Sequence, residues 1–208
     1  LGSGSLSMYM DYHKAKLEGE GGEVMVTSTV ELDERVRDIA EEFFGYVRSE
    51  SSVCLIDDGM NVSKIFHGRD VRAVMIDVDS KEEGVGMACP PECFVGVEYL
   101  EGLRDTVRKE GGVVVVNVSA RDESMWRLVV SRFLTVFGEG RVWGSSGSEE
   151  EVNRVVVGFR CEGVVEALGE EDIMRVVEGW EEDIEEAVRM LKVLTVHDAS
   201  EDAIRTTG

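Results

Sequence analysis

Residues 24–47 read VMVTSTVELDERVRDIAEEFFGYV and contain both periodicities of an α/β protein. Residues 24–32 are rich in β-branched side chains and predict a strand. Asp33 is a residue type that caps helices, and apolar residues follow it at helical spacing. These apolar residues line one face of the predicted helix: Val36, Ile39, Ala40, Phe43, Phe44 and Val47.

The alternation of strand and helix continues along the chain. Further strands are predicted at residues 53–56, 71–78, 113–116 and 152–159, and further helices at residues 100–107 and 126–137. Continuously apolar strands separated by helices indicate an α/β fold with a mostly parallel sheet covered on both faces. Such sheets bind ligands beyond the carboxyl ends of their strands, so the residues after each strand are candidate site residues.

The composition excludes several classes of partner. The chain has 208 residues, and its 43 acidic and 22 basic residues give a net charge of −21. A surface of this sign repels nucleic acids and anionic membranes, which argues against both as main partners. No apolar run reaches the ~18 residues of a membrane span, and the first residues lack the pattern of a secretion signal. These features favour a cytoplasmic protein.

Four cysteines in a chain of this length do not indicate a disulfide framework, and reduced thiols are expected. Cys89 and Cys93 enclose Pro-Pro-Glu, but a zinc site would need a second pair of ligands, and the histidines lie far away in sequence. We therefore predict no metal site and interpret Cys89 and Cys93 as loop thiols.

The first candidate site residues are Gly2, Gly4 and Glu31. The two glycines precede a predicted helix, where a backbone without side chains can approach a ligand and a helix start favours negative groups. Glu31 ends the strand at residues 24–32, the position where an acid accepts the ribose hydroxyls in dinucleotide-type folds. The alternative is an acid placed near Asp33 by the helix dipole. The combination with the glycines favours a ligand.

Two further strand ends carry acids. Asp57-Asp58-Gly59 follows the strand at residues 53–56, where an acid could accept an adenine amine. Taken on its own, this pattern favours a helix cap or a turn. Asp77 and Asp79 lie at the carboxyl end of the strand at residues 71–78, and a carboxylate at such a buried end is costly unless it is used or paired. They are the best catalytic candidates; the alternative is a turn capped by Asp79 and Ser80.

This order of motifs resembles the S-adenosylmethionine-dependent methyltransferases of the Rossmann-like class I fold. The segments VELDERVRDIAEEFFGY, IDDGM, IDVDSKEEGVGMACPP and GGVVVVNVSARD are similar to the spermidine-synthase-like branch. They most resemble the C-terminal domain of the two-domain methyltransferases that modify eukaryotic translation elongation factor 1-alpha. The resemblance covers nearly the whole chain and includes the segment GWEED at residues 179–183.

The resemblance implies S-adenosylmethionine as the cofactor and a role for each matching residue. Gly2 and Gly4 would belong to the cofactor loop, Glu31 would hold the ribose hydroxyls, and Asp58 with Gly59 would meet the adenine amine. Asp77 would lie beside the methionine end of the cofactor and the acceptor pocket. Asp77 and Asp79 would be the catalytic residues that orient the acceptor amine.

The chain departs from the family at its beginning. It starts inside the first motif, so the first strand of the sheet would lie before Leu1, and we expect a fragment. Residues 1–160 are interpreted as the truncated methyltransferase domain, with an antiparallel strand near its C-terminal end. Residues 161–196 are interpreted as an acidic helical extension of that domain, because residues 162–186 contain 11 acids and one base. Residues 197–208 are expected to be a flexible tail.

The resemblance implies an enzyme that methylates the N-terminal amine of elongation factor 1-alpha, its partner protein. The lysine-methylating activity belongs to the other domain of the family and is not carried over. One alternative is a spermidine-synthase-like aminopropyltransferase. Another is a truncated, non-catalytic module that binds partners through its acidic segment. The oligomeric state is left open.

Overall fold

The structure is a computed structural model that describes residues 1–17, 25–79, 87–120, 122–138, 141–146, 153–160 and 192–195. The chain divides into two compact units, Leu1–Ile65 and Phe66–Gly208. Each unit has its own sheet.

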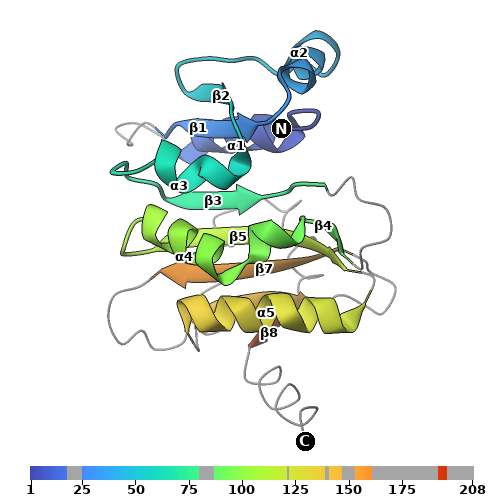
Figure 1. The fold of residues 1–208 in the computed structure, drawn as a ribbon. Helices are drawn as coiled ribbons and strands as arrows, with labels where there is room; N and C mark the ends of the chain where they lie inside the picture. The colour runs from blue at the N-terminus through green and yellow to red at the C-terminus, as the bar shows by residue number, and fades with distance from the viewer. Residues whose placement is uncertain are drawn as a thin grey trace, which may run out of the picture. The chain divides into compact units, whose positions relative to one another are not determined.

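The first unit contains two parallel strands and their helices (Figure 1). Its elements are α1 (Ser5–Leu17), β1 (Thr27–Glu31), α2 (Glu34–Phe43), β2 (Ser52–Ile56), η1 (Gly59–Asn61) and α3 (Val62–Ile65). In the β1–β2 pair, Thr27 lies opposite Ser52 and Glu31 lies opposite Ile56. The carboxyl ends of both strands therefore lie at one edge, where the candidate acids Glu31 and Asp58 follow.

Helix α2 begins as predicted, but its apolar face is not buried. Asp33 caps the helix, because its Oδ1 accepts a hydrogen bond from the backbone nitrogen of Arg35 at 3.0 Å. The helix ends at Phe43, so Phe44 and Val47 lie beyond the helix face that the spacing predicted. Of the six apolar residues only Ala40 is buried, whereas Phe43 is 69% and Val47 71% exposed. Helical spacing identifies the apolar side of a helix, but burial needs a second surface against that side.

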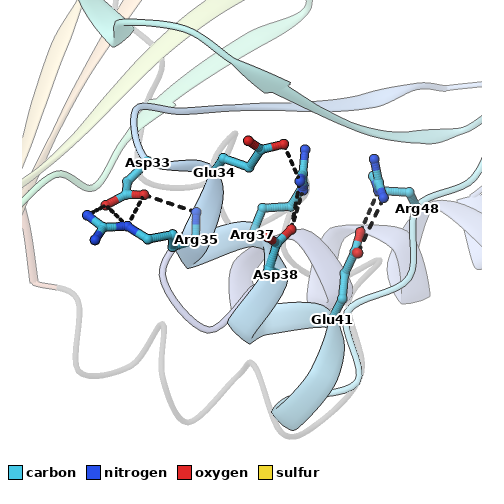
Figure 2. Close-up of polar contacts among 7 residues, drawn as sticks. All are labelled: Asp33, Glu34, Arg35, Arg37, Asp38, Glu41 and Arg48. Atoms are coloured by element: carbon cyan, nitrogen blue, oxygen red, sulfur yellow. Dashed lines mark hydrogen bonds and ion pairs between the residues drawn. The ribbon is translucent and has the colours of Figure 1, made fainter.

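The polar side of α2 is covered by ion pairs (Figure 2). Arg37 contacts Glu34 and Asp38 at 2.7 and 2.6 Å, and Arg48 pairs with Glu41. The hydrogen bonds to Asp38 and Glu34 raise the pKa of Arg37. Exposed ion pairs of this kind contribute little to the free energy of folding, so they do not hold α2 firmly against the rest of the unit.

The second unit contains a larger mixed sheet. Its elements are β3 (Ala73–Ile76), β4 (Met87–Cys89), η2 (Glu92–Val95), α4 (Val97–Thr106), β5 (Gly112–Ala120), α5 (Glu123–Phe137), β6 (Val142–Ser146), β7 (Asn153–Arg160) and β8 (Lys192–Thr195). The strand order is β3-β5-β7-β6-β8, and β4 pairs with the end of β5. The expected α/β fold class is confirmed.

Antiparallel pairing extends beyond the single strand expected. β3 and β5 are parallel, whereas β5–β7, β7–β6, β6–β8 and β4–β5 are antiparallel. The strand predicted at residues 152–159 is β7, and β6 was not predicted. Within the extension predicted to be helical, residues 161–196, Lys192–Thr195 form a strand. The other residues of that extension and the tail at 197–208 lie outside the described residues.

Helices α4 and α5 lie side by side on one face of this sheet (Figure 1). In the helix predicted at residues 126–137, the apolar residues whose spacing indicated that helix are buried: Trp126, Val129, Val130, Phe133 and Phe137. Alternate valines of β5 (Val114, Val116 and Val118) are fully buried. Burial of one such large apolar side chain contributes about 1.5–3 kcal/mol, so the second unit has a substantial core.

Candidate functional site

The predicted glycine turn lies directly before α1. Gly2 and Gly4 have φ values of +55° and +82°, which residues with side chains rarely adopt. The backbone nitrogen of Gly4 donates to the carbonyl oxygen of Leu1, and the carbonyl oxygen of Gly4 accepts from Met8, both at 2.9 Å. A Cβ at position 4 would lie 3.0 Å from the Cβ of Tyr46. Glycine is therefore required at Gly4 by both conformation and space.

The structure brings Glu31 to this turn. Its Oε2 accepts a hydrogen bond from the amino nitrogen of Leu1 at 3.1 Å, and its Oε1 accepts one from the backbone nitrogen of Asp33 at 3.0 Å. The side chain is 14% exposed. The carboxylate is thus held at the carboxyl end of β1, next to the residues of the glycine turn. The hydrogen bond from Asp33 also links the Glu31 carboxylate to the start of α2. This contact agrees with the alternative interpretation, in which the dipole of that helix places the acid.

The acids after β2 form a tight turn at the same edge. The backbone nitrogen of Asp57 donates to the carbonyl oxygen of Glu31 at 3.0 Å. Asp57 Oδ1 accepts from Asn61 Nδ2 at 2.9 Å, and this hydrogen bond lowers the pKa of Asp57. Asp58 Oδ1 accepts from the backbone nitrogen of Met60 at 2.9 Å and caps η1, which begins at Gly59. Asp58 therefore has the capping role of the alternative interpretation.

In the second unit, Asp77 meets a residue that sequence reasoning missed. Asp77 directly follows β3, and the register that pairs Ile76 with Val116 places it beside Asn117 of β5. Asn117 Nδ2 donates to Asp77 Oδ1 at 2.9 Å. Asp79 is an exposed residue further along the same loop. The carboxylate of Asp77 is thus both exposed and tied to a central strand.

Cys89 completes this cluster and is not a loop thiol. It ends β4, is 4% exposed, and its Sγ lies 3.9 Å from Asp77 Oδ1 and 3.5 Å from the carbonyl oxygen of Asn117. Burial raises the pKa of Cys89 from 9.0 to about 11, and the charges of Asp77 and Asp79 add to this effect. The earlier interpretation of Cys89 as a loop thiol was wrong, because strand pairing buries it. Cys93 is exposed in η2.

Other features of the second unit have structural explanations. A cavity of about 300 Å³ is lined in part by Arg104 and Arg160. Arg160 Nη1 donates to the carbonyl oxygens of Arg104 and Val107 at 2.9 and 2.8 Å, and Arg104 Nη1 donates to Val136 at 3.1 Å. These guanidinium groups satisfy carbonyl groups at the C-terminal ends of α4 and α5. The cavity also lies at the opposite end of β5 from Asn117, since Arg160 pairs with Gly112.

The described residues contain no group of three or more histidine, cysteine or acidic side chains arranged to hold a metal ion. Among the helices of the described part, none is long and apolar enough to cross a membrane.

The fold is that of the Rossmann-like class I methyltransferases. The structure of human Methyltransferase-like protein 13 in complex with SAH superposes with a TM-score of 0.70 at 24% identity, covering 86% of this chain and 76% of that one. A probable spermidine synthase from Corynebacterium glutamicum superposes with a TM-score of 0.55 at 20% identity, covering 73% and 52%. At these identities the likeness establishes the fold alone.

The sequence is similar to one part of each of several longer proteins. It is 27% identical over 181 residues to the eEF1A lysine and N-terminal methyltransferase homolog of Drosophila melanogaster, covering 85% of this chain and 25% of that protein. It is 30% identical over 142 residues to the eEF1A lysine and N-terminal methyltransferase of Homo sapiens, covering 66% and 19%. The chain therefore spans a quarter or less of the length of these two relatives. No family model matches. The resemblance predicted from the sequence is confirmed.

Proposed function

We propose that this chain is an S-adenosylmethionine-dependent protein methyltransferase that acts on the N-terminal amine of translation elongation factor 1-alpha. The observation that supports this most is the presence, in one compact unit, of a glycine turn before α1 and of the Glu31 carboxylate at the carboxyl end of β1. Similarity to relatives named eEF1A lysine and N-terminal methyltransferase supports the choice of substrate.

The residues of the first unit fit the cofactor. Gly2 and Gly4 leave the turn before α1 without side chains, so a ligand can contact its backbone. Glu31 offers a largely buried carboxylate that can accept both hydroxyls of a ribose. Asp58 and Gly59 follow β2 at the same edge and would meet the adenine amine. When bound, S-adenosylmethionine supplies a methyl group that is already activated on a positively charged sulfur.

The residues of the second unit would handle the acceptor. Only a neutral amine has the lone pair needed for attack, and an α-amino group, with a pKa of ~7.7–8.0, is neutral far more often at pH 7 than lysine, with ~10.4. A carboxylate near the amine orients it but also favours its charged form. We therefore assign Asp77 the role of hydrogen-bond acceptor and positioner, with Asp79 as a second acceptor nearby.

The cellular setting follows from the same proposal. Cys54, Cys89 and Cys93 are free thiols, which suits a reducing compartment. We place the activity in the cytoplasm.

The test incubates the full chain with isotopically labelled S-adenosylmethionine and a peptide of the elongation-factor N-terminus, either free or N-acetylated. We expect methyl groups on the free α-amine and none on the acetylated peptide, as read by mass spectrometry. Asp77→Asn should lower the rate about 100-fold, because a misplaced acceptor loses that much. Glu101→Gln, an exposed acid of α4, is the matched control and should leave the rate unchanged.

Two results would overturn the proposal. One is a free peptide that stays unmodified while putrescine is converted with decarboxylated S-adenosylmethionine, which would establish the aminopropyltransferase that the spermidine synthase fold neighbour suggests. The other is an equal methylation rate in the Asp77→Asn variant and the parent chain.

A further inference from the structure

Three strands of the second unit bring together side chains that are far apart in sequence. Asp77 follows β3, Asn117 lies within β5, and Cys89 ends β4. β3 pairs with residues 113–116 of β5, and β4 pairs with Ser119 and Ala120 further along the same strand. Both strands flank β5 on the side opposite β7, so Asp77 and Cys89 both approach Asn117.

Asn117 is held rigidly by its strand. Its neighbours Val116 and Val118 are fully buried, and its backbone pairs with Val155 of β7. Asp77 lies in the exposed chain after β3, where a carboxylate with two free torsions would occupy several rotamers. The hydrogen bond from Asn117 Nδ2 to Asp77 Oδ1 therefore connects a mobile group to a fixed one.

Cys89 acts on the same oxygen. Its thiol is within donor distance of Asp77 Oδ1 and of the Asn117 carbonyl oxygen, and it is almost fully buried. A neutral thiol can stay beside a carboxylate, whereas a thiolate would repel it. The high pKa of Cys89 keeps the thiol neutral across the physiological range. Both contacts use Oδ1, and Oδ2 of Asp77 takes part in neither.

We propose that Asn117 and Cys89 are positioning residues, which fix Oδ1 of Asp77 so that Oδ2 faces the acceptor amine in one defined direction. This inference rests on the proposed function, because it assigns a task to Asp77 in amine methylation. A carboxylate fixed before the amine arrives loses less rotamer freedom when it binds. The residues act through Asp77 and need no contact with the substrate.

The kinetic test is a double-mutant cycle with Asn117→Leu and Asp77→Asn in the full chain. Leucine has a similar size but no donor, so we expect kcat to fall about 10- to 100-fold, with the Kd for S-adenosylmethionine unchanged. In the Asp77→Asn background, Asn117→Leu should have almost no further effect. Asn117→Gln, which keeps an amide donor, should recover part of the rate. Asn153→Ala, an exposed asparagine on β7, is the control and should leave kcat unchanged.

A second test reads the cluster without any enzymatic activity. In a chain carrying Cys54→Ala, Cys93→Ala and Cys161→Ala, the alkylation rate of Cys89 should still rise tenfold per pH unit at pH 10, because only the thiolate reacts. Asp77→Asn removes a neighbouring charge and should move this curve to lower pH. Glu101→Gln should not move it.

The outcomes separate the two proposals. A Cys89 curve that levels off near pH 9 and ignores Asp77→Asn would overturn the cluster itself. A shifted curve together with fully additive effects in the kinetic cycle would overturn the positioning role while the methyltransferase remains. A third outcome is that Asp77→Asn shifts the Cys89 curve but the parent chain methylates no N-terminal amine. That outcome would overturn the proposed function, and the positioning role with it.

Discussion

In the second unit, Phe133 of α5 is fully buried, whereas in the first unit Phe43 of α2 is 69% exposed. The first unit buries a small cluster of Ala40, Tyr46 and Cys54. The second unit buries six residues along one side of α5 and every other valine along β5. Both helices have apolar residues at helical spacing, so the difference lies in whether a second surface covers them.

This difference separates the two groups of candidate site residues. Gly2, Gly4 and Glu31 belong to the first unit, whose buried hydrophobic cluster is small. Few buried apolar contacts predict a low local stability. Asp77 and Asn117 belong to the second unit, where the central strand β5 is hydrogen-bonded to β3 along one edge and to β7 along the other. A ligand that binds the folded first unit would stabilise it by mass action. In the second unit, Asn117 holds the carboxylate of Asp77 by a hydrogen bond without a bound ligand.

The largest expected contrast is between Phe133→Ala and Phe43→Ala. The first deletes a fully buried ring and should lower the free energy of unfolding by about 3–5 kcal/mol. The second removes an exposed ring and should change it by no more than about 0.5 kcal/mol. Urea unfolding followed by circular dichroism measures both. A similar loss in the two variants would show that α2 is packed in solution and would remove the contrast between the units.

A smaller effect is expected from the pH dependence of the second unit. Because the pKa of Cys89 rises from 9.0 to about 11 on folding, the folded state holds this proton more tightly than the unfolded state. The resulting stability is present below pH 9 and is lost as pH rises toward 11, by up to about 3 kcal/mol. Cys89→Ala should flatten this part of the curve, whereas Cys93→Ala, at an exposed thiol, should not. A curve unchanged by Cys89→Ala would contradict the buried, neutral thiol.

The order of the main strands and helices could be predicted from sequence because it depends on local patterns. Spacing of 3.6 residues placed five of the six buried positions of α5 and missed Val136, and Asp33 fixed the start of α2. On α2 the same spacing identified an apolar side, but periodicity does not show whether a second surface covers that side. The short strand β6 reads VWGSS, with little of the apolar alternation that marks a strand, so it gave no signal.

The two groups of candidate site residues also differed in how far the sequence could predict them. Gly2, Gly4 and Glu31 could be found because a turn before a helix and an acid after a strand are local features. The cluster around Asp77 depends on the register of three strands, which sequence periodicity does not set. Asn117 did leave one signal, since it is a polar residue inside the otherwise apolar run VVVVNV. The contact with Cys89 left none.

Calorimetric titration of S-adenosylmethionine into the 208-residue chain measures whether the glycine turn and Glu31 bind the cofactor. We predict saturable binding that weakens at least about tenfold in Glu31→Ala, the loss expected when a buried hydrogen-bonding partner is removed. Glu34→Ala, at an exposed acid of α2, should bind as the parent does. If the parent does not bind the cofactor, or Glu31→Ala binds it equally well, the turn and Glu31 are not its binding site.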